Sequence, residues 1–527
     1  MRRSSQFGLI LLLIATLLGA AWLWPDPHQR LFAITGEEAA LSQLRGLAQW
    51  AFRWTRPLPQ TADDVAIAFA DLPPFGVNTF LEQEVELEKR ERSAQMIAEA
   101  GFHWIRQSFP WYDIEIHGKG DFEDRRHEPH RSAWEKYDHI VAVTEAHGLS
   151  IIARLEAPPA WSRAAGTARG AFGPPDDFAD YGDYVAAVAE RYRGRIRFYQ
   201  IWNEPNIYPE WGNHPVDPEA YTELLCLAHA RIKAVDPDAV IISGAMAPTL
   251  ELGTWNPGYE GNNLMDVVYL QRMYNAGAGD CFDVMAVNNY MLWSGPTDRR
   301  MMPYEVNFSR PLWVRDVMVA NGDAAKPIWI SEMNSNAAPE PIPANFGRVT
   351  LEEQARYAPL AYERIQREWP WAGVTTVWFF KRATDTEVDQ PFYYFRMVEP
   401  DFTPMPLYTS LHEYLNTLRP TLYPGRHQAS TWQLAYQAEY EDALAPEAAL
   451  GRYRRFSGAV AFYWEGRRLT LVPGPEGGRV TITTNAGAPV DVTLADTPVV
   501  IARMGAGVHH TTIHAEGWAA LDELVVE

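Results

Sequence analysis

Two classes of residue are scarce in this sequence: cysteine, and basic residues relative to acidic ones. Cys226 and Cys281 are the only cysteines among 527 residues, too few for a zinc framework or a disulfide scaffold. We expect two buried free thiols, with a single disulfide as the alternative in an oxidising compartment. The 46 Lys and Arg against 67 Asp and Glu give a net charge of −21, which argues against nucleic acid as a partner.

Metal-binding motifs are also lacking. The segment His127-Glu128-Pro129-His130 does not have the His-Glu-x-x-His spacing of zinc proteases. The pair His509-His510 lies near the end of the chain without a cluster of carboxylates beside it in the sequence. We therefore expect no metal site and no cofactor.

One long apolar run is present, from Phe7 to Trp24, preceded by Arg2 and Arg3. A helix of this length spans about 27 Å, close to the thickness of the hydrocarbon core of a bilayer. The positive flank predicts that the N-terminal end stays in the cytoplasm and that the rest of the chain is exported. We favour an uncleaved membrane anchor over residues 1–27; a signal peptide cleaved near Leu18 to Ala21 is the alternative.

The rest of the chain divides into three parts by pattern. Residues 28–70 carry apolar side chains at near-helical spacing and then prolines, which predicts a helical stalk and a linker. Residues 71–420 alternate short apolar runs with longer helical stretches. The runs are residues 76–80, 103–109, 150–155, 196–202, 240–243, 282–287, 327–331 and 374–379. Eight such alternations predict a (β/α)8 TIM barrel. Residues 421–527 are rich in Val, Thr and Gly with alternating apolar positions, which predicts an antiparallel β-sandwich.

Two glutamates follow apolar strands of the predicted barrel. The fourth run leads into Asn203-Glu204-Pro205, and the seventh leads into Glu332. In a barrel of this kind the carboxyl ends of all strands meet at one mouth, so both carboxylates are expected there. Cleavage of a glycosidic bond needs one protonated and one ionised carboxyl group on either side of the anomeric carbon. The pair therefore predicts a glycosidase.

The segments Trp202-Asn203-Glu204-Pro205-Asn206 and Trp329-Ile330-Ser331-Glu332 resemble the paired signatures of clan A retaining glycoside hydrolases. Together with Gly76-Val77-Asn78 on the first strand, they are most similar to family 39, which includes β-xylosidases and exopolysaccharide-degrading enzymes. The resemblance covers roughly residues 70 to 420. It implies a retaining β-glycosidase that acts on an oligo- or polysaccharide by double displacement.

The resemblance also implies roles for individual residues. Glu204 is expected to be the catalytic acid/base and Glu332 the nucleophile. The expected substrate-binding or supporting residues are Asn203 at the sugar 2-hydroxyl, Arg106 and Tyr290 beside the nucleophile, Trp378 as an aromatic floor, and Glu156, Trp161, Asn289 and Lys381 as contacts for other hydroxyls. Glu156 matches no xylosidase pattern securely, which leaves the identity of the sugar open.

Two other functions fit the same sequence. A non-catalytic glycan-binding protein of the cell envelope could keep the barrel, although such proteins usually lose one of the two carboxylates. A transglycosylase would share every catalytic residue and differ only in its acceptor. On each interpretation the partner is a carbohydrate and the barrel lies outside the cytoplasm. With the favoured uncleaved segment, the chain is attached to the membrane through its N-terminus.

Overall fold

The computed structural model describes residues 26–168, 170–213, 215–253, 263–495 and 497–527. The apolar run from Phe7 to Trp24, expected to be an anchor or signal peptide, lies outside these residues. Within them, no helix has both the length and the apolar character needed to cross a bilayer.

A barrel of parallel strands forms the centre of the molecule. Its strands are β1 (Phe75–Thr79), β2 (Trp104–Pro110), β5 (Ser150–Glu156), β6 (Phe198–Ile201), β7 (Val240–Ile242), β8 (Met285–Asn288), β9 (Ile328–Met333) and β10 (Ala372–Val377). They form an 8-stranded sheet in the order β7-β6-β5-β2-β1-β10-β9-β8. Parallel bridges from Ile242 to Val284 and from Met246 to Val287 close the sheet between β7 and β8. The expected barrel is therefore confirmed.

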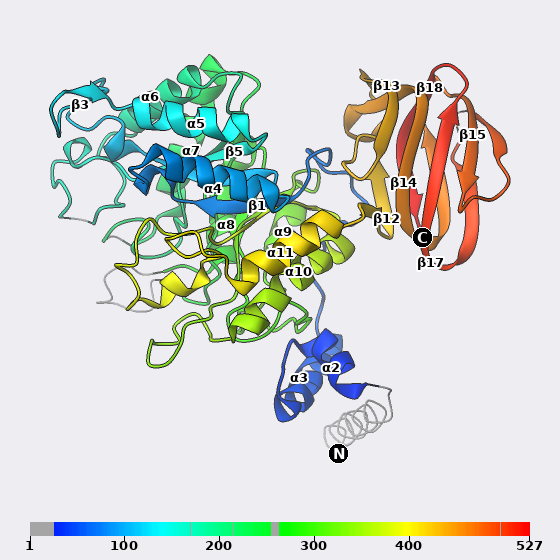
Figure 1. Cartoon of the computed structure of the whole chain (residues 1–527), viewed down its shortest axis with the longest axis horizontal. Helices are drawn as coiled ribbons and strands as arrows, with labels where there is room; N and C mark the ends of the chain where they lie inside the picture. Colours follow the sequence, from blue (N-terminus) through cyan, green and yellow to red (C-terminus); the bar gives the residue numbers. More distant parts are fainter. Residues whose placement is uncertain (1–25, 169, 214, 254–262, 496) are drawn as a thin grey trace.

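A helix follows each barrel strand and covers its outer face (Figure 1). These helices are α4 (Leu87–Glu99), α5 (Glu135–Ala146), α6 (Phe178–Arg191), α7 (Pro218–Val235), α8 (Asp266–Asn275), α9 (Pro311–Ala320), α10 (Leu351–Glu368) and α11 (Pro406–Thr417). Local sequence fixes several of their ends. Asp217 caps α7 by accepting a hydrogen bond from the amide of Ala220, and Thr350 and Glu353 form a capping box at α10.

The amino ends of the barrel strands are closed by the linker that precedes β1. Phe69 lies 6.2 Å from the ring of Phe198 and 6.4 Å from that of Trp329. Trp432, which leads into the C-terminal sheet, packs 5.6 Å from Phe75 at the start of β1. The C-terminal sheet therefore adjoins the amino ends of the strands, and the carboxyl ends form an open mouth on the opposite side.

The C-terminal part is a mainly antiparallel sheet folded on itself as a sandwich. It contains β11 (Thr421–Leu422), β12 (Gly425–Gln428), β13 (Ala435–Leu444), β14 (Arg452–Pro473), β15 (Gly478–Thr484), β16 (Val490–Leu494), β17 (Val499–Ala515) and β18 (Ala519–Val526). The long strand β14 pairs with β11, β13, β17 and β18. Its alternate side chains, including Phe456 and Trp464, fill an apolar core between the two layers. The expected sandwich is thus present, although β14 pairs with β11 and β18 in parallel.

Before the barrel, α2 (Pro27–Thr35) and α3 (Ala40–Phe52) form a short helical pair, followed by η1 (Arg53–Thr55). The pair packs against the loop between β8 and α9. The amide of Gly295 donates to the carbonyl of Gly36 at 2.6 Å. A Cβ atom added at Gly36 would lie 2.6 Å from the carbonyl oxygen of Gly295, so this close approach needs glycine.

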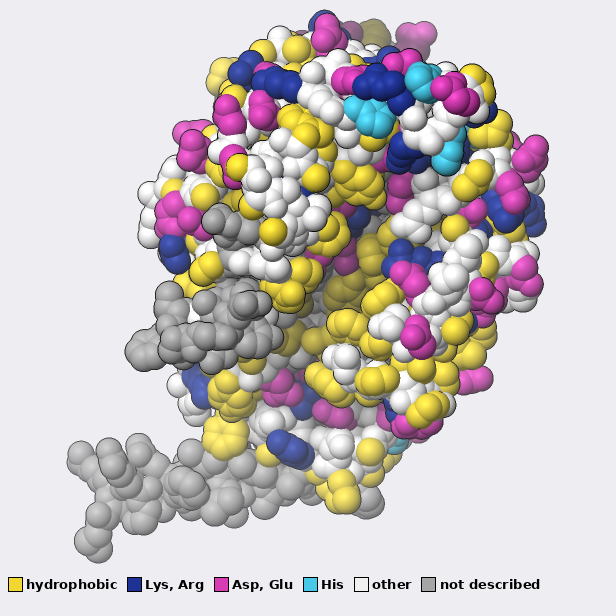
Figure 2. Space-filling model, turned by 90° about the vertical axis from the view of Figure 1, so that its left-hand side faces the viewer, with side chains coloured by type: hydrophobic (Ala, Val, Ile, Leu, Met, Phe, Trp, Pro, Cys, Tyr) yellow, Lys and Arg dark blue, Asp and Glu magenta, His cyan; other side chains and the backbone are white. Residues whose placement is uncertain are grey.

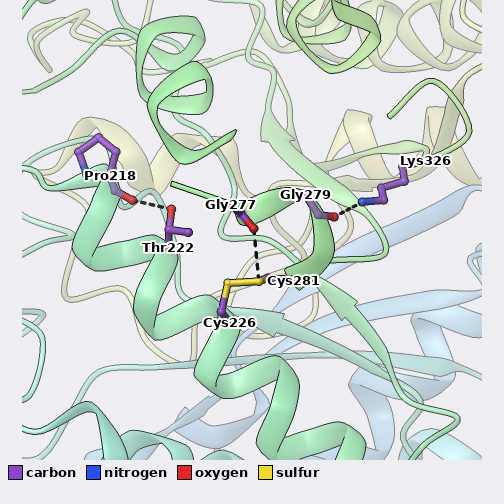
Figure 3. The surroundings of a disulfide bond; sticks show 7 residues. All are labelled: Pro218, Thr222, Cys226, Gly277, Gly279, Cys281 and Lys326. Atoms are coloured by element: carbon purple, nitrogen blue, oxygen red, sulfur yellow. Dashed lines mark hydrogen bonds between the residues drawn. A yellow bond between two sulfur atoms is a disulfide. The ribbon is translucent and has the colours of Figure 1, made fainter. Parts of the chain in front are cut away.

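The two cysteines form a disulfide, contrary to our expectation of free thiols. Cys226 lies on α7, and Cys281 ends the short helix η5 (Ala278–Cys281), where their Cα atoms are 4.7 Å apart (Figure 3). The sequence separation of 55 residues gave no indication of this proximity. The docking of η5 on α7 across the intervening strand and helix brings the two thiols together.

Candidate active site

Glu332, the fifth residue of β9, lies at the barrel mouth with both carboxylate oxygens bonded. Its side chain is buried. Arg106 of β2 donates to Oε1 at 2.8 Å, and the hydroxyl of Tyr290 donates to Oε2. A second guanidinium, that of Arg154 on β5, lies 3.9 Å from Oε1. Two guanidinium groups and a hydroxyl donor therefore surround this carboxyl group.

Arg106 connects the strands around Glu332. Its guanidinium donates to Asn78 and Glu332, each at 2.8 Å, to Gln200 at 2.6 Å, and to Oδ1 of Asn203 at 2.8 Å. These partners come from β1, β9, β6 and the residues just after β6. Because one buried guanidinium group is hydrogen-bonded to four side chains, the position of Glu332 is fixed relative to the segment that carries Glu204.

Glu204 has a different environment, although it faces the same mouth. It follows β6, with a left-handed φ of 35°, and its carboxyl group is held by one neutral donor, Nδ2 of Asn288, at 2.7 Å. Loss of water around the carboxyl group, followed by the negative charge of Glu332, raises the pKa of Glu204 to about 8. One carboxyl group of the pair therefore keeps its proton at neutral pH while its neighbour is held by cations.

Asn288 is bonded to Glu204 and was missed in the sequence, where we expected the adjacent Asn289 to face the site. Asn288 on β8 is in register with Glu332 on β9, and its side chain reaches Glu204. Asn289 is buried and donates instead to the backbone carbonyl of Phe308 at 3.1 Å. Side chains alternate between the two faces of a strand, so a one-residue difference decides which asparagine faces the mouth.

Tyr290 lies where the sequence placed it, beside the nucleophile candidate. Burial, followed by the charge of Glu332, raises its pKa well above the ordinary value for tyrosine. The phenol therefore stays protonated at neutral pH and can only donate to the carboxylate of Glu332 in this arrangement. The ring packs 5.2 Å from that of Phe395, which fixes its direction.

A second group of charged side chains lies beside this pair. Arg154 bonds Glu156 at 2.6 Å, and Glu156 also accepts from Ser108 at 3.1 Å. Glu156 is thus occupied by protein partners. Glu210, in the loop after β6, lies close to Asn203, and its pKa is raised well above the ordinary value, first by burial and then by the charge of Glu156.

The other side chains that were predicted to contact the sugar have different surroundings in the structure. Trp378, directly after β10, is half-buried and packs edge-on against Phe80 at 5.4 Å. Trp161 is half-buried and donates from its indole nitrogen to the carbonyl of Glu115 at 2.7 Å. Lys381 is buried in an ion pair with Glu84 and is therefore held by the protein itself.

The face of the molecule opposite the sandwich is hollowed at its centre. Figure 2 shows this hollow with hydrophobic side chains around it and acidic and basic groups inside it. A cavity of about 580 Å³ lies beside it, under the loop after β2. Its charged groups are largely paired with one another, as in Arg126 with Asp113 at 2.9 Å. We therefore place the reactive centre at the two mouth carboxyl groups and not in this cavity.

The fold and the site together define a (β/α)8 barrel with two unlike carboxyl groups at its mouth. Solved structures similar to this chain include a family 39 glycoside hydrolase from Bacteroides cellulosilyticus, at 17% identity and a TM-score of 0.49, covering 85% of this chain and 82% of that one. A monomeric β-xylosidase from Caulobacter crescentus has 14% identity and a TM-score of 0.47 over 88% of this chain and 98% of its own. An exo-β-1,4-mannosidase from an Opitutaceae bacterium has 16% identity and a TM-score of 0.46 over 68% and 62%.

No family model and no curated protein matches the sequence. The barrel assignment accordingly comes from the strand order itself, and the function has to be argued from the geometry of the mouth.

Proposed function

We propose that this chain is a retaining β-glycosidase that cleaves an oligo- or polysaccharide by double displacement. The observation that carries the proposal is the difference between the two mouth carboxyl groups. Glu332 is bonded to Arg106 and Tyr290, whereas Glu204 has a pKa raised to about 8. A protonated acid beside an ionised carboxylate is the arrangement that this reaction requires.

In the first step, an oxygen of Glu332 attacks the anomeric carbon while Glu204 gives its proton to the departing glycosidic oxygen. The C–O bond to the leaving sugar breaks, and a glycosyl ester forms on Glu332. In the second step, Glu204, now ionised, takes a proton from water, and that water attacks the anomeric carbon. The ester bond to Glu332 breaks, and both carboxyl groups return to their starting forms.

Asn203 is suited to hold the sugar during these steps. Its Oδ1 accepts from Arg106 at 2.8 Å, and its side chain lies close to Glu210. The amide carries two N–H groups, so one remains to donate to a hydroxyl of the sugar. A hydrogen bond from such a donor to the 2-hydroxyl strengthens as the oxocarbenium-like transition state forms.

The activity is tested with a panel of aryl β-glycosides and polysaccharides, using wild type, Glu332→Gln and Glu128→Gln. Glu128 is 83% exposed and lies in the loop after β2, distant in sequence from Glu204 and Glu332. Its variant therefore controls for the loss of one glutamate charge. Turnover that disappears only in Glu332→Gln supports the proposal. No turnover by wild type on any substrate, with glycan binding unchanged in Glu332→Gln, would favour the non-catalytic alternative.

We also propose that the chain is exported and held at the membrane by its N-terminal apolar segment. The run from Phe7 to Trp24 behind Arg2 and Arg3 supports this topology. The Cys226–Cys281 disulfide supports it independently, because such bonds persist in oxidising compartments and are rare in the cytosol. Fractionation of cells tests it: the full chain should sediment with membranes and resist extraction at alkaline pH.

A further inference from the structure

The helix α3 exposes apolar side chains on the surface that faces away from the barrel. Leu41 is 83% exposed and Phe52 is 41% exposed, and Leu58 in the following segment is 50% exposed. Leu41, Arg45, Ala48 and Phe52 follow one another at spacings of three or four residues, which puts them along one side of a helix. Soluble helices normally turn such a strip toward the core.

Charge is also divided between the two sides of this helical pair. Residues 27–58 hold four arginines and two glutamates. Both glutamates face the barrel: Glu37 pairs with Arg300 at 2.8 Å, and Glu38 accepts from the hydroxyl of Tyr357 at 2.6 Å. Arg45 and Arg56 are exposed. The outer side is therefore basic and apolar, in a chain whose net charge is −21.

The helical pair is tied firmly to the barrel, so its outer side has a fixed direction. Besides the contact of Gly36 with Gly295, the hydroxyl of Thr297 donates to the carbonyl of Phe32 at 2.5 Å, and the Arg356 guanidinium lies 4.9 Å from the ring of Phe32. Figure 1 shows α2 and α3 beside the barrel and apart from the sandwich.

We propose that the outer side of α3, with Leu41, Arg45 and Phe52, docks on an anionic lipid surface together with Arg56 and Leu58 in the segment that follows. This inference rests on the proposed membrane attachment, because the apolar run ends at Trp24, only three residues before α2 begins. Apolar side chains that enter the headgroup region, together with arginines at its surface, are the features by which amphipathic helices bind anionic bilayers.

The test uses the full chain in vesicles of phosphatidylglycerol and phosphatidylcholine in equal parts. Because both native cysteines are in the disulfide, a nitroxide on Leu41→Cys is the single label. A matched label on Val490→Cys, 56% exposed on the sandwich, is the control. Collisions with a water-soluble nickel chelate and with oxygen report the depth of each label. We expect the chelate collision rate to be at least about threefold lower at position 41 than at position 490.

A charge variant makes the test specific to the surface. Arg45→Glu with Arg56→Glu should remove the shielding at position 41, while Arg131→Glu with Arg479→Glu, the same change of charge on exposed residues elsewhere, should leave it intact. Shielding should also weaken in vesicles of phosphatidylcholine alone.

Three results would overturn the inference, and they are distinguishable. If the chain sediments with vesicles but both labels stay equally accessible to the chelate, the docking is wrong and the anchor survives. If position 41 is shielded without lipid, another protein surface covers it. If the chain does not enter vesicles, the membrane attachment fails together with the docking. Turnover of an aryl glycoside by the same preparation reports separately on the proposed activity.

Discussion

Substitution of Asn288 by alanine should move the pH dependence of the proposed reaction toward higher pH. Nδ2 of Asn288 donates to Oε1 of Glu204 at 2.7 Å and stabilises the ionised form of that carboxyl group. Removing this donor therefore raises the pKa of Glu204 further above its value of about 8. A hydrogen bond to a charged group contributes roughly 1.5–3 kcal/mol, and 1.36 kcal/mol corresponds to one pKa unit. The lower end of this range gives a rise of at least about one unit.

The assay is the pH profile of kcat/KM for the best aryl glycoside from the panel. Because the free enzyme must carry the Glu204 proton before the aglycone leaves, the basic limb of the profile reports this pKa. The limb should lie near pH 8 in wild type and at least about one unit higher in Asn288→Ala. Asn289→Ala is the matched control, since Asn289 bonds the carbonyl of Phe308 and not Glu204. A limb that stays in place in Asn288→Ala, or moves to lower pH, would refute the reasoning.

Three further predictions concern the network and the scaffold. Arg106→Ala should lower kcat roughly 10²–10³-fold, because it removes a donor to the charged group that reacts. The loss should be smaller in Arg106→Lys. Steady-state kinetics, together with a thermal melt of each variant, separates a loss of catalysis from unfolding. Lys381→Met should destabilise the barrel by about 3–5 kcal/mol, because Glu84 is left buried without its cation, and Glu84→Gln added to it should recover part of the loss in urea. Replacing Cys226 with alanine opens a loop of 55 residues and should cost about 4 kcal/mol, measured as a lower denaturant midpoint; an unchanged midpoint would contradict this.

The barrel could be predicted from the sequence because its signals are local. Each strand is a short apolar run followed by a helix with its own stop or cap, as in the helix that ends before Asp236-Pro237. The carboxyl ends of parallel barrel strands must meet at one mouth, so the convergence of Arg106, Glu204, Tyr290 and Glu332 could be predicted from topology. Their catalytic roles remain predictions until they are measured.

The parts that could not be predicted depend on register or on long-range packing. The choice between Asn288 and Asn289 turns on a one-residue register that no local pattern fixes. Glu156 ends strand β5, where a sugar-binding residue could lie, yet its partner Arg154 lies two residues earlier on the same face of that strand. This spacing was visible in the sequence, and it was the signal that could have revealed the ion pair.

Glu210 and the disulfide carried weaker signals. Glu210 lies in a loop after β6, and only the folded chain brings it to Asn203. Cys226 and Cys281 belong to different helices of the outer layer, and their pairing depends on how η5 packs against α7. Neither position has a periodicity or a motif from which the contact could be inferred.

The most direct test of the central claim is to trap the glycosyl-enzyme. The chain is incubated with 2-deoxy-2-fluoro β-glycosides that carry a good leaving group. The fluorine slows both steps, whereas the good leaving group speeds only the first. The glycosyl-enzyme therefore accumulates. Peptide mass spectrometry then locates the sugar. We predict a single ester on Glu332, absent from Glu332→Gln and present in Glu204→Ala. If the enzyme turns over substrate but carries no ester, or carries the ester on another carboxylate, Glu332 is not the nucleophile of a double displacement.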